Sequence, residues 1–379
     1  MVLLWASGCR EPAAGGAPNL VLVTIDTLRV DPLGPWGGDP GLTPALSAFA
    51  ADSTVFDQAI SAAPWTKPAV TTIFTSQLPR DHGVTQWEPE YALPPETPTL
   101  TTALRAAGYE TSAVVSHLAL DPEEGNHFEV GFDRFDRSVL GLGHPHVVTS
   151  AEPVADLALA ELDHLRPPFF LWTHFFDAHA NYLPHPEHPT GDLPYDLYQG
   201  EIAWIDDQLG RLLDAASDPD TVVVVMADHG EEFYDHGGVE HTHTLYDELV
   251  HVPLIVHRPG DAPSRVGVTV GSIDVAPTIL AALEVPAPST FTGEPLTWTA
   301  AGPSAVADRT VFSETSRQAA LRSVTRGAHK LVHDLATGGW TLFDRSADPG
   351  ETVDASAAQP EVRAELEARL RETYPEIAR

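Results

Sequence analysis

The chain has 379 residues, a formal net charge of −33 and a single cysteine, Cys9. One cysteine excludes an internal disulfide, a thiolate zinc site and an iron–sulfur cluster, and the strongly negative charge argues against a nucleic-acid-binding protein. With 43% hydrophobic residues, the chain has enough apolar side chains to bury a sizeable core.

The first 17 residues form a tail rich in small residues around Cys9. Residues 6–8, Ala-Ser-Gly, precede the cysteine as in the cleavage site of a bacterial lipoprotein signal, which this segment resembles. The apolar run 2–5 is shorter than the about 7–15 residues of a secretory signal, so a plain N-terminal tail is the alternative. The first interpretation predicts export to the periplasm, or anchoring in a bacterial envelope through a lipid on Cys9. No later stretch of about 18 apolar residues predicts a transmembrane helix.

Strands and helices alternate from residue 19 to about residue 283. Continuous β-branched apolar runs predict buried strands of the parallel type, and apolar residues at helical spacing predict the helices between them. The expected strands are 19–25, 111–115, 168–173, 221–226 and 252–256, and the expected helices are 42–51, 66–74, 97–107, 154–165, 201–216 and 273–283. This alternation predicts an α/β fold with a mostly parallel sheet between helices.

From about residue 309 the pattern changes to short alternating segments. These segments predict a small antiparallel sheet, and a charged helix over 361–372 follows it. The expected strands are 311–314, 320–324, 329–333 and 340–343. We therefore expect a tail (1–17), a catalytic α/β domain (18–308) and a C-terminal subdomain (309–379) packed on it.

Polar, metal-competent residues follow three of the expected strands. Asp26 ends the first strand, Asp228 and His229 end strand 221–226, and three candidates, His174, Asp177 and His179, follow strand 168–173. Because ligands of open α/β sheets bind beyond the carboxyl ends of the strands, these side chains are expected to form a site. A lone aspartate at a strand end could instead cap the next helix.

Carboxylates and imidazoles together suit a borderline divalent ion. Asp26, Asp228 and His229 offer two oxygens and a nitrogen, and Thr66 offers a hydroxyl oxygen as a further ligand. Metal binding lowers the pKa of a hydroxyl and makes it a nucleophile. Thr66 precedes Lys67-Pro68 at an expected helix start, where the dipole attracts an anionic substrate. The alternative for Thr66 is a helix N-cap.

The motifs that carry a family resemblance occur in order along the chain. The segments are 17–26 (APNLVLVTID), 43–46 (TPAL), 63–68 (APWTKP), 75–84 (TSQLPRDHGV), 107–111 (AGYET), 176–182 (FDAHANY), 227–231 (ADHGE), 235–237 (DHG), 246–254 (YDELVHVPL) and 330–351. Over roughly residues 18–375, the chain resembles the sulfatases of the alkaline-phosphatase-like superfamily. The resemblance implies a metal-dependent hydrolase or transferase that acts on a small anionic ester through a covalent intermediate.

The resemblance also implies roles for individual residues. It makes Asp26, Thr66, Asp228 and His229 ligands of one divalent ion (Mn²⁺, Zn²⁺ or Ca²⁺, the first two favoured by the histidine). It makes Thr66 the nucleophile, His179 the acid for the leaving group, and Lys67 a cation that neutralises substrate oxygens. His117, His241 and His243 stand at or near positions where relatives use lysine or asparagine to bind substrate. A second metal site of Asp177, His179 and His243 is a further alternative.

Three departures from the family pattern leave the chemistry open. Thr66 replaces the Cys or Ser that becomes formylglycine, Ala69-Val70 lacks the arginine of that motif, and Asp26-Thr27 replaces a pair of aspartates. A sulfated threonine cannot collapse to an aldehyde, whereas displacement by water or an alcohol is usual for phosphoryl groups. The nucleophile therefore favours phosphate or phosphonate esters, with sulfate esters as the alternative. A sulfatase-fold binding protein that lost its chemistry is the non-enzymatic alternative.

Overall fold

The computed structural model describes residues 16–143, 145–296, 298–299, 302–303 and 309–378. Cys9, and with it the predicted lipid anchor, lies outside the described residues. Among the described helices, none is both long and apolar enough to cross a bilayer.

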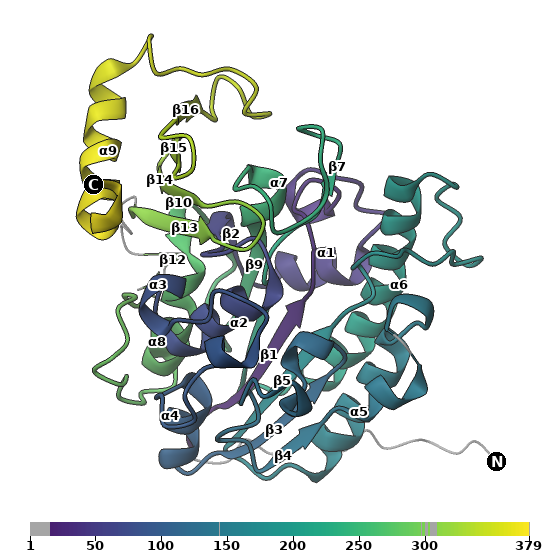
Figure 1. Ribbon diagram of the computed structural model, residues 1–379. Coiled ribbons are helices and arrows are strands. Elements are labelled where there is room, and N and C mark those ends of the chain that lie inside the picture. The colour runs from purple at the N-terminus through teal and green to yellow at the C-terminus, as the bar shows by residue number, and fades with distance from the viewer. Residues whose placement is uncertain (1–15, 144, 297, 300–301, 304–308, 379) are drawn as a thin grey trace, which may run out of the picture.

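An eight-stranded sheet forms the centre of the molecule (Figure 1). Its order is β10 (Ser264–Gly271), β2 (Thr54–Ile60), β9 (His251–His257), β6 (Thr221–Ala227), β1 (Asn19–Ile25), β5 (Phe169–Phe175), β3 (Glu110–Val115) and β4 (Arg134–Asp136). Strand β9 runs antiparallel to its neighbours β2 and β6, and the other pairs of this sheet are parallel. The prediction of a mostly parallel α/β sheet is confirmed.

Two groups of helices cover the sheet (Figure 1). Helices α1 (Pro44–Ala51), α5 (Ala151–His164) and α6 (Pro194–Ala215) pack against one another on one side. Helices α2 (Thr66–Thr75), α4 (Leu100–Ala106) and α8 (Val275–Ala282) pack together on the other. Strands β1, β5 and β6 are buried along their whole length, as their continuous apolar runs predicted.

Sequence patterning did not identify strands β2, β4 and β10. In β2, two polar residues, Asp57 and Gln58, interrupt the apolar run, and β10 contains Arg265 and Gly267. Helix α6 begins at Pro194, seven residues before the expected start at Glu201. Its first two turns, PYDLYQG, contain a proline and a glycine, so the sequence pattern did not assign them to the helix.

A four-stranded antiparallel sheet forms most of the C-terminal subdomain, as predicted. The strands follow in chain order, β13 (Val311–Thr315), β14 (Leu321–Arg326), β15 (His329–Asp334) and β16 (Trp340–Asp344). Helix α9 (Pro360–Thr373) packs on this sheet around a small apolar core that includes Leu331 and Leu366. The remaining short elements are α3 (Pro79–His82), β7 (Glu232–Phe233), β8 (Val239–Glu240), α7 (Asp247–Val250), β11 (Trp298–Thr299) and β12 (Gly302–Pro303).

Candidate active site

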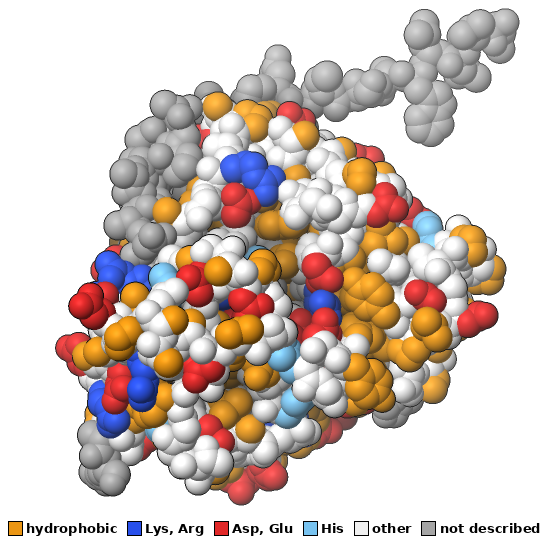
Figure 2. Space-filling model, turned by 90° about the horizontal axis from the view of Figure 1, so that it is seen from above, with side chains coloured by type: hydrophobic (Ala, Val, Ile, Leu, Met, Phe, Trp, Pro, Cys, Tyr) orange, Lys and Arg blue, Asp and Glu red, His pale blue; other side chains and the backbone are white. Residues whose placement is uncertain are grey.

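The candidate site lies beyond the carboxyl ends of neighbouring strands β6, β1, β5 and β3. Asp26 follows β1, Asp228 and His229 follow β6, His174 lies near the end of β5, and His117 follows β3. Viewed from above, this side of the molecule is hollowed, and histidine side chains are visible near its middle (Figure 2). The topology therefore brings together residues that are up to 203 positions apart, as expected for the carboxyl edge of a parallel sheet.

The floor of the site contains buried carboxylates without hydrogen-bond partners. Asp26 and Asp228 are fully buried, and among the described residues both oxygens of Asp26 and Oδ2 of Asp228 have histidine nitrogens nearby but no well-aligned hydrogen bond. His229 Nε2 lies 3.2 Å from Asp26 Oδ1 and 3.6 Å from Asp228 Oδ2. A buried carboxylate is costly unless it is paired or binds a metal, so these oxygens are suited to bind a cation.

The two aspartates respond differently to the surrounding charges. Burial acts to raise the pKa of Asp26, but interactions with His117, His174 and His229 bring it well below its ordinary value. Burial raises the pKa of Asp228 to about 6, even though His229 opposes the change. Asp26 is therefore the carboxylate that stays ionised most firmly at this site.

Hydrogen bonds to Nδ1 distinguish the roles of His229 and His117. Nδ1 of His229 donates to the Gly230 carbonyl at 2.9 Å, so Nε2 is the nitrogen that faces Asp26. Burial acts to lower the pKa of His229, but Asp228 and Asp26 raise it to about 9, so a metal that binds Nε2 must displace a proton from it. Nδ1 of His117 accepts the Ala119 amide at 2.7 Å, so its Nε2 carries the proton, 3.2 Å from Asp26 Oδ2. His229 is thus suited to bind a metal, whereas neutral His117 is suited to donate a hydrogen bond.

Thr66 is the first residue of α2, and its hydroxyl points into this cluster. Oγ1 lies 3.2 Å from His229 Nε2 and 3.4 Å from His117 Nε2. The helix includes Thr66 and has Trp65 as its N-cap, without a capping side chain. The alternative interpretation, a Thr66 N-cap for a helix that starts at Lys67, therefore finds no support in this geometry.

The residues present fit a divalent cation. Ligand atoms of Asp26, Asp228 and His229 lie within 4.8 Å of one another, and Thr66 Oγ1 adds an oxygen beside them. A second set, Asp26 with His117 and His179, meets the same distance limit, but the proton on His117 Nε2 disfavours it. Two carboxylates, an imidazole and a hydroxyl are the donors that Mn²⁺ and Zn²⁺ accept in proteins.

His179 and His241 form the wall of the site next to these donors. Nδ1 of His179 donates to the Ala180 carbonyl at 2.7 Å, and Nδ1 of His241 donates to Glu231 Oε1 at 2.8 Å. Their ring centroids are 4.9 Å apart. Burial lowers the pKa of both rings, so each is neutral in the free protein, with a lone pair on Nε2.

A buried carboxylate that sequence reasoning did not assign orients this wall. Glu231 accepts hydrogen bonds from His241 and, at 2.9 Å, from the Tyr182 hydroxyl. Burial raises the pKa of Glu231 to about 7 despite the opposing charges of His179 and His229. Its place as the last residue of the motif 227–231 was the available signal.

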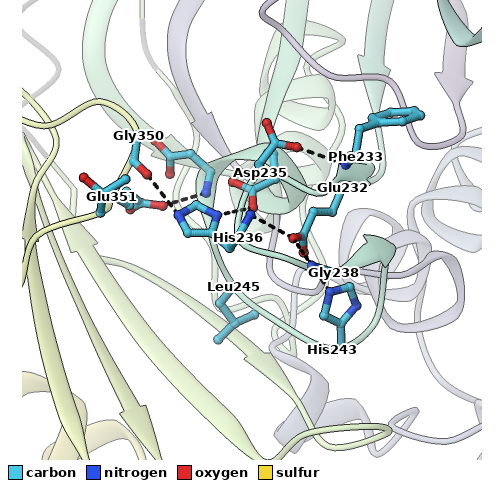
Figure 3. A network of polar contacts seen from close by, with 12 residues as sticks. Glu232, Phe233, Asp235, His236, Gly238, His243, Leu245, Gly350 and Glu351 are labelled. Atoms are coloured by element: carbon cyan, nitrogen blue, oxygen red, sulfur yellow. Dashed lines mark hydrogen bonds and ion pairs between the residues drawn. The ribbon is translucent and has the colours of Figure 1, made fainter. Parts of the chain in front are cut away.

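His243, predicted to contact substrate, instead holds the loop that carries His241 (Figure 3). Its Nε2 lies 2.7 Å from Glu232 Oε2, and its Nδ1 donates to the His241 carbonyl at 3.2 Å. Glu232 also accepts the amides of His236 and Gly238 at 2.9 and 2.7 Å. Both nitrogens of His243 are therefore engaged by the protein.

The predicted second metal site does not assemble among the described residues. Asp177 accepts the backbone amides of Ser150 and Ala151 at the start of α5, together with the Ser150 hydroxyl. His243 is bound to Glu232. Asp177 thus caps a helix rather than facing His179 and His243.

Lys67 is buried next to the site and has no carboxylate partner in the described chain. Its Nζ donates to the Trp87 carbonyl at 2.7 Å, and burial lowers its pKa to about 8, although Glu88 and Glu124 oppose the change. Among the described residues, no hydrogen bond joins Lys67 Nζ to Thr66 Oγ1. Lys67 therefore contributes a nearby positive charge.

A pocket of about 230 Å³ opens over Thr66, His117, His179 and His241. Its other walls include Trp65, Trp87, His146, Phe176, Glu240 and Arg317. Sequence reasoning assigned none of these six to the site, and it regarded Trp65 as a core residue. The available signals were the position of Trp65 directly before Thr66 and the place of Phe176 at the start of the motif 176–182.

A family model described as "Sulfatase" matches residues 18–285, which is most of the chain. The chain belongs to the sulfatase family. A second model, "N-sulphoglucosamine sulphohydrolase, C-terminal", matches residues 234–376 and so extends the similarity through the C-terminal subdomain. The predicted family membership is confirmed, and with it an ester hydrolase of the sulfuric- or phosphoric-ester class.

Individual relatives cover most of the chain at low identity. The uncharacterized sulfatase YidJ of Escherichia coli (strain K12) is 23% identical over 73% of this chain and 70% of that protein. The delta 4,5-hexuronate-2-O-sulfatase of Bacteroides thetaiotaomicron is 23% identical over 88% of this chain and 83% of that protein. The crystal structure of the phosphonate monoester hydrolase of Agrobacterium radiobacter superposes with a TM-score of 0.75 and 19% identity, over 95% of this chain and 96% of the other.

Proposed function

We propose that this sulfatase-family protein cleaves phosphate or phosphonate esters through Thr66 as nucleophile, with a divalent metal held by Asp26, Asp228, His229 and Thr66. The observation that carries the proposal is the position of Thr66 Oγ1 at the start of α2, 3.2 Å from His229 Nε2 and in the same cluster as the buried carboxylates of Asp26 and Asp228. A hydroxyl placed there can lose its proton and attack an anionic ester that the helix N-terminus helps to bind.

When bound, the ion supplies Lewis acidity, which lowers the pKa of a coordinated hydroxyl and stabilises charge on neighbouring oxygens. The Thr66 hydroxyl gives up its proton to solvent, and its oxygen forms a bond to phosphorus while the bond from phosphorus to the leaving alcohol breaks. His117 Nε2–H donates a hydrogen bond to an oxygen of the transferred group. This hydrogen bond strengthens as negative charge develops on that oxygen. A proton on His179 Nε2 passes to the leaving alcohol, and water or an acceptor alcohol then displaces Thr66 from phosphorus.

The protonation state of His179 determines how it can supply a proton to the leaving alcohol. Because burial keeps its pKa below the ordinary value, His179 is neutral before substrate binds. A negatively charged ester entering the pocket favours the imidazolium and so raises the pKa of the ring. His179 therefore takes up a proton with the substrate and delivers it to the leaving group.

Phosphorus is favoured over sulfur because of the nucleophile. A threonine ester of phosphate or phosphonate can be resolved by in-line displacement, whereas Thr66 offers no aldehyde exit for sulfate. The fold similarity to a phosphonate monoester hydrolase is compatible with this choice. Sulfate-ester cleavage is the second candidate, since the family model and the E. coli and B. thetaiotaomicron relatives carry that name.

The test compares three aryl esters with one leaving group. The 4-nitrophenyl phosphate diester, phenylphosphonate monoester and sulfate monoester are each assayed with purified protein and added Mn²⁺ or Zn²⁺. We expect the two phosphorus esters to be turned over faster than the sulfate, and intact-mass analysis of a quenched reaction to show an adduct that maps to Thr66. If all three esters fail and Thr66→Ala binds them as the wild type does, the binding-protein alternative is correct.

A further inference from the structure

Arg317 lies in the turn between β13 and β14 and lines the same pocket as Thr66. Its guanidinium carbon lies 4.8 Å from the ring centroid of Trp65 and 5.3 Å from that of Trp87. Two indoles thus hold one planar cation by cation–π contact. Trp65 directly precedes the nucleophile, so the cation is positioned by the same segment that presents Thr66.

Several hydrogen bonds fix the turn that carries Arg317. Gln86 Nε2 donates to the Ser316 carbonyl at 2.8 Å, which ties the turn to the Trp87 segment. Thr315 Oγ1 donates to the Thr242 carbonyl at 2.7 Å, which ties it to the loop of His241. The C-terminal subdomain therefore places the guanidinium over the catalytic pocket at a defined position.

Arg317 has no hydrogen bond and no ion pair within the described part of the chain, although acids outnumber bases 54 to 21. It is in contact there with two tryptophan rings. Burial acts to lower the pKa of Arg317, and the charge of Glu88 opposes this without forming an ion pair. The other described arginines are ion-paired, with the exception of Arg166, which lies on the exposed surface. Five N–H donors of Arg317 are therefore available to a ligand.

The depth of the pocket separates two anion positions. Thr66 and His117 are buried, whereas Arg317 is exposed to solvent. The group transferred to Thr66 must reach the buried donors at the floor. The part of the substrate that extends outward, past the aromatic walls Trp65, Trp87 and Phe176, reaches Arg317.

We propose that Arg317 binds a second anionic group, carried by the alcohol portion of the substrate, and so selects esters whose leaving group is itself negatively charged. This proposal rests on the function proposed above. The planar fork of the guanidinium matches a carboxylate bidentately and also accepts a sulfate or phosphate group. Trp65 and Trp87 keep the fork in place, so little side-chain entropy is lost when the anion binds.

The experiment uses matched esters of the same phosphonic acid with three leaving groups: 4-nitrophenol, 3-carboxy-4-nitrophenol and the corresponding 3-sulfonate. We expect the wild type to prefer a charged leaving group, and Arg317→Ala to lower kcat/KM for that ester about 10- to 100-fold more than for the uncharged ester, through KM. Arg317→Lys keeps the charge but not the fork, and restores part of the loss. If Arg317→Ala affects the carboxylated ester more, the bound group is a planar anion; if it affects the sulfonated ester more, the bound group is tetrahedral.

Arg166→Ala is the matched control, because it removes another arginine without an ion pair far from the pocket. It is expected to leave all three rates unchanged. Equal losses for charged and uncharged esters in Arg317→Ala, or the same preference in both arginine variants, would overturn the proposal.

Failure of the proposed function can be separated from failure of this subsite. If the wild type turns over none of the esters, binding of the free phenols 4-nitrophenol and 3-carboxy-4-nitrophenol is measured by calorimetry. Tighter binding of the carboxylated phenol that Arg317→Ala abolishes supports the subsite without catalysis. Equal binding of both phenols, or no effect of Arg317→Ala, contradicts it.

Discussion

Two clusters of buried carboxylates in this molecule differ in whether arginine or lysine side chains neutralise them. At the junction with the C-terminal subdomain, the buried ammonium of Lys330 lies 2.5 Å from Asp247 and 2.8 Å from Glu351, and Arg345 lies 2.6 Å from Asp247. At the candidate active site, the oxygens of Asp26 and Oδ2 of Asp228 are buried, and among the described residues they have no hydrogen bond and no arginine or lysine partner.

The difference separates a structural cluster from a functional one. Burial acts to raise the pKa of Asp247, but Lys330 and Arg345 hold it well below its ordinary value. Asp228, without such cations, has a pKa raised to about 6. A fold tolerates uncompensated buried carboxylates mainly where a ligand supplies the missing charge. The two lysines of the chain differ in the same way. Lys330 forms ion pairs with Asp247 and Glu351, whereas Lys67 donates a hydrogen bond to one backbone carbonyl.

The largest effect is expected from the hydroxyl at the centre of the unpaired cluster. Thr66→Val keeps the volume of the side chain but removes the nucleophile, so kcat/KM for the preferred aryl ester should fall by about three orders of magnitude or more. Thr66→Ser should retain measurable activity. Thr71→Val is the control, because Thr71 Oγ1 donates only to the Lys67 carbonyl within α2. Activity that survives in Thr66→Val would exclude Thr66 as the nucleophile.

The paired cluster should respond through stability instead. Lys330→Met leaves Glu351 and Asp247 buried with less positive charge, so the free energy of unfolding should fall by about 3–5 kcal/mol. Lys67→Met removes one hydrogen bond to a carbonyl and should cost about 1 kcal/mol. Denaturant unfolding of both variants measures the contrast. Equal losses would show that the two lysines do not differ in structural role.

A bound metal ion should make the unpaired carboxylates Asp26 and Asp228 stabilise the fold instead of destabilising it. At a hundredfold excess of Mn²⁺ or Zn²⁺ over its Kd, the free energy of unfolding of the wild type should rise by about 2.7 kcal/mol. Asp228→Asn removes a ligand, so its stability should respond less to the ion. In metal-free buffer the same variant should be at least as stable as the wild type, because a buried unpaired carboxylate has been removed. A wild type that is indifferent to both ions would contradict the ligand assignment.

Sequence patterns predicted the parts of the site that follow strand ends, but not the parts that depend on distant turns. Asp26 and Asp228 could be placed because buried strands are read from continuous apolar runs and the edge of a parallel sheet is shared. Arg317 meets Trp87 only because the β13–β14 turn folds over the pocket, and no local pattern encodes that contact. The direction of His243 was also not predictable, since it is decided by Glu232 across a short hairpin.

Dependence on distant residues also explains which strands the sequence pattern predicted and which it did not. Strands β1 and β6 have uninterrupted apolar sequences, so their type and position were clear. Strand β2 contains Asp57 and Gln58. Asp57 is ion-paired with Arg265 of the neighbouring β10, and Gln58 accepts a hydrogen bond from Arg345 of the C-terminal subdomain. Its strand character depends on tertiary partners that a local window does not contain.

The smallest effect is expected from His236, which lies at the border of the two regions. Its Nδ1 lies 2.7 Å from Glu248 Oε1, its Nε2 donates to the Gly350 carbonyl at 2.9 Å (Figure 3), and its ring stacks on Tyr246 at 3.5 Å. Burial acts to lower the pKa of His236, but Glu248 and the carbonyl raise it above 6.5. Both nitrogens face acceptors, so the folded state favours the imidazolium.

The sign of the pH dependence follows from that raised pKa. Because the folded protein holds this proton more tightly than the unfolded chain, the stabilisation is fully present below pH 6.5 and is lost as the pH rises through the folded-state pKa. His236→Gln should therefore destabilise the protein more at pH 6 than at pH 8.5, by less than about 1 kcal/mol for this partly exposed pair. Urea unfolding of both proteins at the two pH values measures the difference. A loss that is constant or larger at high pH would show that His236 supports the junction as a neutral ring.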